Sequence, residues 1–505
     1  MKRENSNKKG YVLNLFSAYG SSMVSALIGI ATAPISLSYW KIEKFGVWSI
    51  ITSFAAYLSV SGLGIDVACG ILMTKNASIA SKNRIFKRSL AMITLTALAL
   101  LALLVLLSKL MPGWITYLGN MSLEVKGIAR KTTLIFVFSF IINIPFGVIA
   151  NSFASYQKAY LNNIFNLFQA ILGFIVLLAV IVIKLNMPMY AILVGISWLI
   201  LNIIKTIIFL REKNIYEAET KESIGNRMAE ESRHIILITG VRLWLYGMAL
   251  MVTQNIGSLI ISNHLSINQV TPYILTYKIF SLLFTIVTMT NISAAPMLGR
   301  EYSIGNWPWI IQMHKKLFIS TLFLNGAIWI GSIMFLKDVI RVWVGATGYA
   351  GFLTTVLLGA WFLLHGLSNL NYVVINAFNY TKKISLISWL ETIVFIIVST
   401  LLIGSVGIAA IPIGLLCGTI IGPLWALPYI IHKRSKGSLK YDINAFKKAL
   451  IVIASFVVLA VFSEYYLAET ILKLGLNLVI FGFYCIIFYK ILWLEIGASI
   501  KLGIN

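Results

Sequence analysis

The chain has 505 residues, of which 59% are hydrophobic and only 11% are charged, and its formal net charge is +24. Soluble domains carry roughly 25% charged residues, so the composition excludes an ordinary soluble enzyme. It also excludes disorder, which requires low hydrophobicity, and three cysteines are too few for a disulfide scaffold. We therefore expect a polytopic membrane protein.

Fourteen apolar runs are long enough to cross a bilayer as helices, which takes about 20 residues each. In chain order they lie near residues 11–39, 45–64, 89–110, 132–153, 163–183, 188–210, 235–262, 272–296, 317–336, 352–372, 384–403, 407–431, 449–466 and 470–494. The alternating segments of about 10 residues that are typical of β-barrels do not occur in the sequence. The predicted fold class is all-α, with two six-helix lobes and two extra C-terminal helices.

Lys and Arg are concentrated on alternate loops. With the N-terminus in the cytoplasm, the predicted cytoplasmic segments hold about three times as many of these residues as the external ones. The positive-inside rule then places both termini in the cytoplasm, in a bacterial inner membrane. Because this rule and anionic lipid headgroups explain the basic excess, we expect membrane lipids as partners and no nucleic acid.

The loops divide the chain into five predicted parts. They are an N-terminal six-helix lobe (1–210), a cytoplasmic hinge loop (211–234), a C-terminal six-helix lobe (235–431), a cytoplasmic loop (432–448) and two additional helices with a tail (449–505). A short repeat supports this division, since Asn151–Lys158 and Asn376–Lys383 share three of eight residues at an offset of 225. Halves separated by six spans keep the same orientation and are related by an axis along the membrane normal.

The sequence lacks the motifs of membrane enzymes. No Gly-rich phosphate loop ending in Lys-Ser/Thr occurs, the five histidines have no metal-binding spacing, and no external loop contains an Asp-x-Asp pair. The longest external connection has only about twenty residues, near 111–131, which leaves little room for an external catalytic domain. We expect a transporter rather than an enzyme, with no cofactor and no metal.

Charged residues inside membrane spans are costly and indicate functional sites by default. Two basic residues lie well inside the predicted spans, Arg242 in the seventh and Lys278 in the eighth, and we count those closer to span ends, Lys205 among them, with the loops. A guanidinium can bind a phosphate through two parallel hydrogen bonds, although both side chains can instead extend to the headgroups. Glu391 in the eleventh span and Asp66 at the inner end of the second are candidate ion-coupling residues, or else interfacial charges.

Uncharged polar residues also recur in the spans. Gln254 and Asn255 join Arg242 and Lys278 as candidate substrate-binding residues. Similar positions are Asn143, Asn166, Gln169, Asn202, Asn291, Asn369 and Asn371. Such residues either join helices by hydrogen bonds or line a hydrated path for sugars. Three prolines are expected to kink their helices: Pro34, Pro145 and Pro296.

The first two spans carry a recognisable pattern. It comprises Pro34–Tyr39 with the sequence PISLSY, Lys44–Ile50 with KFGVWSI, and Ser61–Ile65 with SGLGI. This pattern resembles the Wzx-type O-antigen flippases of the multidrug/oligosaccharidyl-lipid/polysaccharide exporter (MOP) superfamily. The repeated turn at Asn151–Lys158 and Asn376–Lys383 also resembles that family.

The resemblance implies two six-helix lobes around a V-shaped cavity and a flippase that moves an undecaprenyl-diphosphate-linked oligosaccharide to the periplasmic leaflet. In that case Arg242 and Lys278 would meet the diphosphate. A polysaccharide polymerase and a chain-length regulator are then expected protein partners. The open alternatives are a drug or metabolite antiporter like the MATE transporters, or a polysaccharide polymerase or ligase.

Overall fold

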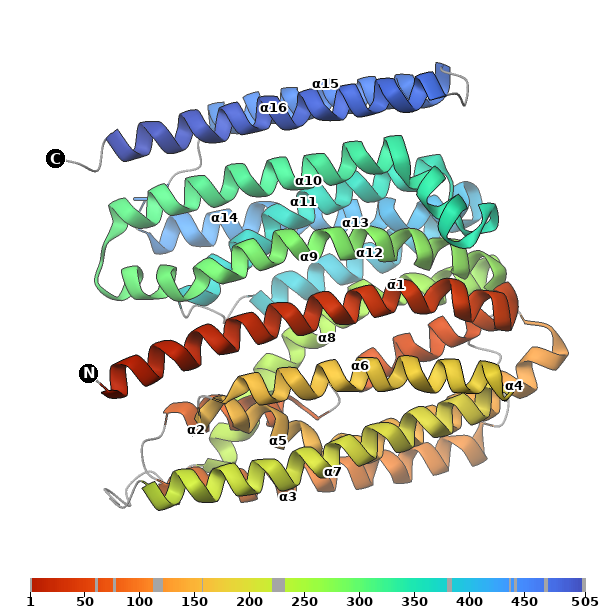
Figure 1. The fold of residues 1–505 in the computed structure, drawn as a ribbon, viewed down its shortest axis with the longest axis vertical. Helices are drawn as coiled ribbons and strands as arrows, with labels where there is room; N and C mark the ends of the chain where they lie inside the picture. Colours follow the sequence, from red (N-terminus) through yellow and green to blue (C-terminus); the bar gives the residue numbers. More distant parts are fainter. Residues whose placement is uncertain are drawn as a thin grey trace. The chain divides into compact units, whose positions relative to one another are not determined.

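The computed structural model consists of helices and short connections. It describes residues 2–59, 62–75, 79–111, 121–156, 158–219, 232–378, 384–435, 437–439, 443–466 and 471–501. Helix follows helix along these ranges, with no strand among them (Figure 1). Lipid offers backbone groups no water to bond, so spanning segments satisfy their own hydrogen bonds as helices.

The α-helices have the following bounds: α1 (Lys2–Ser59), α2 (Ile65–Lys75), α3 (Ile79–Leu110), α4 (Leu123–Asn143), α5 (Phe146–Ser152), α6 (Ala159–Val182), α7 (Met187–Glu219), α8 (Ser232–His264), α9 (Ile267–Ser303), α10 (Trp307–Val344), α11 (Phe352–Ala377), α12 (Ile384–Val406), α13 (Ala410–Ile421), α14 (Pro423–Arg434), α15 (Ile443–Tyr466) and α16 (Ile471–Lys501). Three short 3₁₀-helices join them: η2 (Phe153–Tyr156), η3 (Ala346–Gly348) and η4 (Gly407–Ala409).

Ten helical runs in the described residues are long and apolar enough to cross a membrane, or up to 11 with one bent pair. Several of the ten are longer than one span requires, and two of these are interrupted, namely Phe16–Ser53 with 38 residues and Ile384–Arg434 with 51. The first contains a break at Lys41, whose φ is 63° and ψ 174°. The second contains α12, α13 and α14. The predicted all-α polytopic fold is confirmed.

Proline positions explain one bend but not the break in α1. Pro145 lies between α4 and α5, whose axes differ by 48°, as a proline that cannot continue a helix requires. In α1 the non-helical residue is Lys41 rather than Pro34, which stays inside the helix. Pro296 likewise lies within the bounds of α9.

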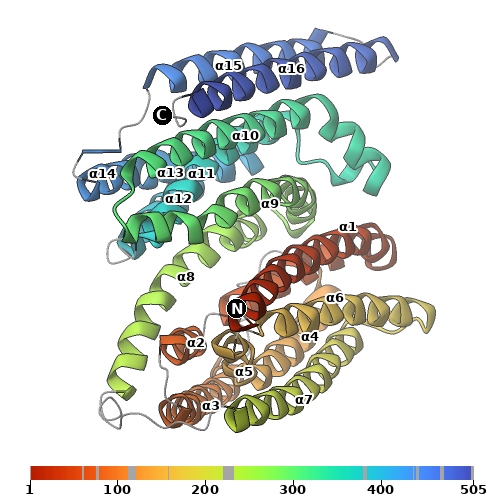
Figure 2. The same ribbon diagram turned by 60° about the vertical axis from the view of Figure 1, so that its left-hand side comes forward.

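The chain divides into two compact units, the first formed by Met1–Asn255 with Ser266–Asn268 and the second by Ile256–Leu265 with Gln269–Asn505. In the first unit α1 packs on α4 and α6, α4 on α7, and α2 on α3 and α5 (Figure 2). The ring of Phe209 is fully buried there and contacts the rings of Phe86 and Phe153 at 5.3 and 5.1 Å. The five predicted parts of the chain stay predictions.

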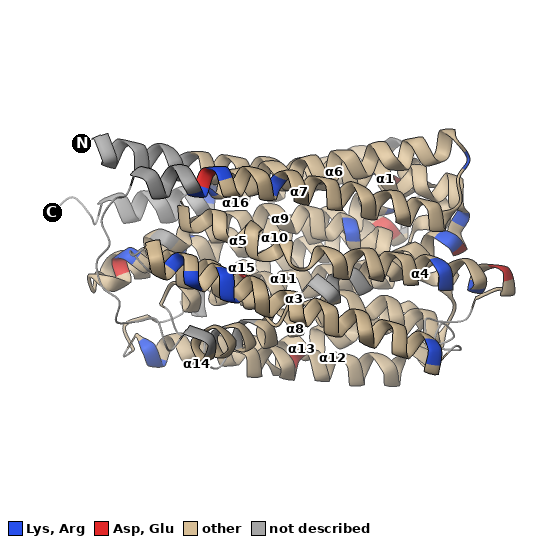
Figure 3. Cartoon of the chain, turned by 90° about the horizontal axis from the view of Figure 1, so that it is seen from below, with Lys and Arg blue, Asp and Glu red and all other residues tan. Residues whose placement is uncertain are grey.

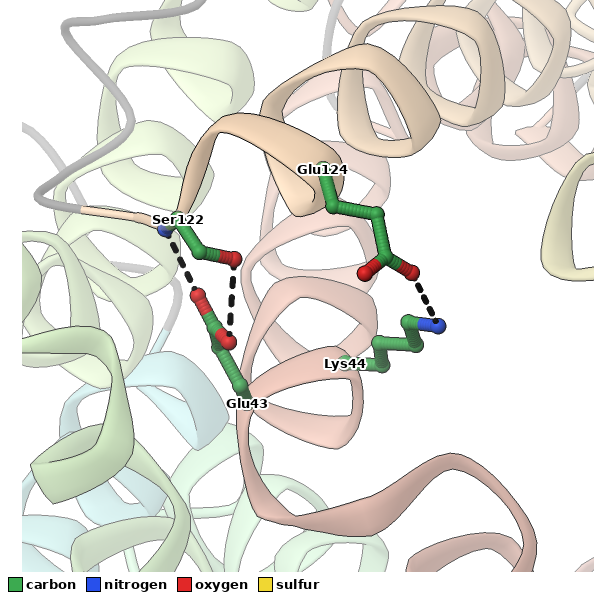
Figure 4. A network of polar contacts seen from close by, with 4 residues as sticks. All are labelled: Glu43, Lys44, Ser122 and Glu124. Atoms are coloured by element: carbon green, nitrogen blue, oxygen red, sulfur yellow. Dashed lines mark hydrogen bonds and ion pairs between the residues drawn. The ribbon is translucent and has the colours of Figure 1, made fainter.

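A polar network joins the segment after Lys41 to the start of α4 (Figure 4). The carboxylate of Glu43 accepts hydrogen bonds from the backbone N–H of Ser122 at 2.8 Å and from its hydroxyl at 3.2 Å. Lys44 forms an ion pair with Glu124 at 3.2 Å. Glu43 therefore satisfies a backbone donor at a helix N-terminus, where carboxylates are favourable.

In the second unit α10 is the central element, because α11, α15 and α16 all pack on it. The α15–α16 hairpin is held by polar contacts. Glu464 pairs with Lys473 at 2.7 Å and with Lys337 of α10 at 3.9 Å. The hydroxyl of Tyr484 on α16 donates to the carbonyl of Phe323 on α10 at 2.8 Å. These contacts fix the two C-terminal helices to α10.

Charged residues are unevenly placed along the helices. Figure 3 shows most Lys, Arg, Asp and Glu near helix ends, with long uncharged stretches between them. Within the described part of the first repeated turn, Lys158 pairs with Glu212 of α7. The second repeated turn, Asn376–Lys383, continues into residues 379–383, which lie outside the described ranges.

Candidate functional site

The first unit contains a polar cavity of about 210 Å³ among its helices. It is lined by Gly62, Asp66, Ile93, Phe140, Asn143, Ile144, Phe146, Gly147, Gln169, Trp198, Asn202 and Lys205. Residues from α2 to α7 contribute to this wall. Ligand sites combine apolar walls with a few convergent polar groups, so this cavity is the candidate site of the first unit.

Asp66 reaches the cavity because a tight turn precedes α2. Gly64 has a φ of +65°, and a Cβ there would lie 2.4 Å from the carbonyl oxygen of Gly240, so only glycine fits. The Asp66 carboxylate accepts a hydrogen bond from Nδ2 of Asn151 at 3.1 Å. Gly147 leaves room for it, since a Cβ at that position would lie 3.2 Å from Oδ2 of Asp66. The proposed ion-coupling role of Asp66 stays a prediction.

Lys205 is a cavity residue that the sequence analysis missed. It lies in the apolar run Met187–Lys213 and is only 6% exposed. The expectation that Arg242 and Lys278 are the only basic residues within spans is therefore wrong. Lys205 lies close to the end of the predicted span 188–210, next to a loop with several Lys and Arg, and was therefore counted with that loop. The spacing of Trp198, Asn202 and Lys205, four and then three residues, places them on one helix face and was the available signal.

An amide pair connects α4 and α7 at the cavity wall. Nδ2 of Asn202 donates to Oδ1 of Asn143 at 2.7 Å, and Nδ2 of Asn143 donates to the carbonyl of Ser139 at 2.8 Å. This is the interhelical role that such residues commonly have in membranes. The same two amides also line the cavity, and their predicted role in a path for sugars stays a prediction.

Glu391 occupies the interior of the second unit. Its side chain on α12 is 3% exposed, and Oε1 accepts a hydrogen bond from the hydroxyl of Thr419 on α13 at 2.8 Å. That hydroxyl in turn accepts from Nε1 of Trp361 on α11 at 3.1 Å. Gly418 permits this close packing, because a Cβ there would lie 2.5 Å from the carbonyl oxygen of Glu391. Glu391 is therefore buried among α11, α12 and α13.

The candidate substrate-binding residues lie on two helices. Arg242, Gln254 and Asn255 belong to α8, and Lys278 belongs to α9. The side chain of Arg242 lies outside the described part, Gln254 is exposed, and Lys278 is half-buried. Asn255 donates to the carbonyl of Met251 at 3.0 Å. Their role in substrate binding stays a prediction.

A second amide network crosses the second unit. The hydroxyl of Thr321 on α10 donates to Oδ1 of Asn291 on α9 at 3.0 Å, and Nδ2 of Asn291 donates to Oδ1 of Asn369 on α11 at 3.5 Å. These contacts have the geometry of interhelical bonds. Among the described residues, no group of three or more His, Cys, Asp or Glu side chains is placed to hold a metal ion.

No family model matches the sequence, and no curated protein matches it. Solved structures do match the fold. The lipid II flippase MurJ in an inward closed conformation superposes with a TM-score of 0.66, at 14% identity, over 95% of this chain and 99% of that one. A mutant of the Vibrio cholerae MATE transporter VcmN gives a TM-score of 0.60 at 15% identity, over 85% of this chain and 98% of that one.

A MOP superfamily transporter from Pyrococcus furiosus, for which a reversed polarity of the binding pocket has been described, gives a TM-score of 0.58 at 10% identity, over 88% of this chain and 96% of that one. Identities this low establish a shared fold only. They confirm the fold that the resemblance implies, while membership of the superfamily and the Wzx-type assignment stay predictions. The chain is thus a multi-pass membrane protein with the fold of the MOP-superfamily transporters.

Proposed function

We propose that the protein is a flippase that moves an undecaprenyl-diphosphate-linked oligosaccharide from the cytoplasmic to the periplasmic leaflet, for O-antigen or capsule synthesis. The observation that carries the proposal is the fold, which is shared over almost the whole chain with a structure described as a lipid II flippase. The sequence pattern at Pro34–Ile65 supports the lipid-linked oligosaccharide as the substrate class.

The proposed mechanism is alternating access between two lobes, without an enzymatic step. Arg242 and Lys278, helped by Gln254 and Asn255, would bind the diphosphate and the first sugars, because a guanidinium pairs with phosphate oxygens through two hydrogen bonds. The polyprenyl tail would stay in lipid. In this proposal the protein lies in the inner membrane with both termini in the cytoplasm.

An ion gradient would drive the cycle, because the sequence lacks a nucleotide-binding loop. One charge crossing the membrane supplies about 2.3 kcal/mol per 100 mV. Glu391 and Asp66 are the proposed ion-coupling residues. The burial of Glu391 supports this, since a carboxyl held between helices by one hydroxyl donor is a costly feature to keep without a function.

The decisive experiment locates the lipid-linked intermediate that accumulates when the gene is deleted. A missing flippase leaves the intermediate on the inner leaflet, whereas a missing polymerase or ligase leaves it on the outer leaflet. Normal surface polysaccharide combined with a drug-sensitivity phenotype would instead identify a MATE-like antiporter.

Complementation of the deletion strain tests the site. Arg242→Ala should abolish surface polysaccharide at an unchanged protein level. Lys109→Ala is the matched control, because Lys109 is exposed in the last turn of α3. Normal polymer with Arg242→Ala would contradict the assigned role of Arg242.

A further inference from the structure

Two apolar cavities lie in the first unit along α3 and α4. One has a volume of about 550 Å³ and is lined by residues of α3, α4 and α7, and the other, of about 290 Å³, is lined by residues of α3 and α4. They share the wall residues Leu104, Ser108 and Leu134. Apolar cavities exclude water, and unfilled ones lose packing contacts. In a bilayer the alkyl chains of lipids are available to occupy these two cavities.

The larger apolar cavity adjoins the polar cavity through Asn143, which lines both. The side chain of Asn143 is held by Asn202 at 2.7 Å, so this wall has a defined position. Asn143 therefore borders both the larger apolar cavity and the polar cavity. A ligand that fits both has an alkyl part and a polar head.

The polar cavity presents one charge of each sign. Lys205 is 6% exposed and lines this cavity, and no hydrogen bond or ion pair of its ammonium occurs within the described ranges. Asp66 lines the same cavity, and one carboxylate oxygen accepts from Asn151. A buried charge that lacks a partner is costly, so a ligand anion at Lys205 would be favourable. A ligand cation that donates N–H bonds would be favourable at Asp66.

We propose that these cavities form a binding site for a zwitterionic membrane phospholipid with a phosphoethanolamine head. Its phosphate accepts hydrogen bonds from Lys205, and its primary ammonium donates to Asp66. Its acyl chains occupy the two apolar cavities. A quaternary ammonium cannot donate such a bond, and a head with only negative charge would be repelled by Asp66, so phosphatidylcholine and phosphatidylglycerol should bind more weakly.

The test measures lipid retained by the full-length purified protein after exchange into palmitoyl-oleoyl phosphatidylethanolamine and detergent washing, by native mass spectrometry. Lys205→Met should lower retention about tenfold, since a charged hydrogen bond contributes about 1.5–3 kcal/mol. Lys213→Met is the matched control, because Lys213 lies on the same helix with its ammonium over the ring of Phe86. Asp66→Asn should reduce the preference of the protein for phosphatidylethanolamine over phosphatidylcholine.

A second pair of variants tests the apolar part without changing a buried charge. Val105→Trp fills the larger cavity from an exposed position, whereas Leu106→Trp is equally exposed but lines neither apolar cavity. Only Val105→Trp should release the lipid. Equal retention by all variants, meaning adventitious annular lipid only, would overturn the proposal, as would equal retention of phosphatidylcholine. Retention is measured without transport, so this result is independent of the proposed flippase activity.

Discussion

Asn202 of α7 donates a hydrogen bond of 2.7 Å to Asn143 of α4, and this bond fixes one wall of the polar cavity. In the same cavity Asp66 and Lys205 bring opposite charges into the interior of the first unit. The Asn143–Asn202 pair therefore joins helix packing to a charged site, and loss of the pair should affect both.

Asn202→Ala should lower the thermal stability of the purified protein. Interhelical hydrogen bonds in membranes contribute about 0.6 kcal/mol on average and up to about 1.7 kcal/mol, and Asn143 would lose its donor. Ile203→Ala is the control, because Ile203 is on the same helix but 46% exposed. Equal melting temperatures for the two variants would show that the amide pair contributes nothing.

Gly418→Ala should destabilise the second unit. A Cβ at Gly418 would lie 2.5 Å from the carbonyl oxygen of Glu391, so α12 and α13 would have to separate. Gly404→Ala, on α12 with no atom within 4 Å of the new Cβ, should instead be neutral or stabilise by up to about 1 kcal/mol. Melting curves test whether the two substitutions change the stability in opposite directions. A stabilising Gly418→Ala would contradict the observed packing.

Glu391→Gln should abolish ion-coupled transport while the fold is retained. The amide oxygen of glutamine can still accept from Thr419 at the position where Oε1 accepts now, but the charge is lost. The measurement is surface polysaccharide in the complemented deletion strain, with protein level and melting temperature as controls. Ser405→Ala, at an exposed position of α12, should be normal in every assay, and normal polymer with Glu391→Gln would remove Glu391 from the mechanism.

Glu43→Ala should destabilise the first unit more than Glu124→Ala. Glu43 accepts two hydrogen bonds from Ser122 at the start of α4, and loss of a helix-end contact of this kind costs about 1 kcal/mol. Glu124 makes an exposed ion pair with Lys44, which contributes about 0–1 kcal/mol. Denaturation midpoints at low and high salt distinguish the two, because only the Lys44–Glu124 ion pair joins two opposite charges and should depend strongly on salt.

A topology reporter fused after Gly225 should be active only in the cytoplasm. Gly225 belongs to the predicted hinge loop 211–234, which is rich in Lys and Arg, and the positive-inside rule places such loops in the cytoplasm. A fusion after Gly345, between α10 and α11, is the matched external position. A periplasmic signal from the Gly225 fusion would reverse the predicted orientation.

The kind of the elements followed from the sequence, because an apolar run of about 20 residues in lipid has few alternatives to a helix. Their number did not, since fourteen spans were predicted and the described residues hold ten spanning runs, or up to 11. The fold implied by the resemblance at Pro34–Ile65 is likewise the one that the structure has. Hydropathy also identified Asp66, Asn143, Gln169 and Asn202 as polar residues in apolar surroundings, and these four line one cavity.

The depth and the partners of each charge depended on tertiary structure. Lys205 lies near the end of an apolar run that a basic loop follows, so hydropathy could not tell an interfacial lysine from a buried one. Only the packing of α2 to α7 places Lys205 in a cavity with Asp66. Similarly, the approach of Gly418 to Glu391 decides that this carboxyl is buried. Hydropathy depends on local composition, whereas burial depends on which helices meet, and that is decided by contacts between residues far apart in the chain.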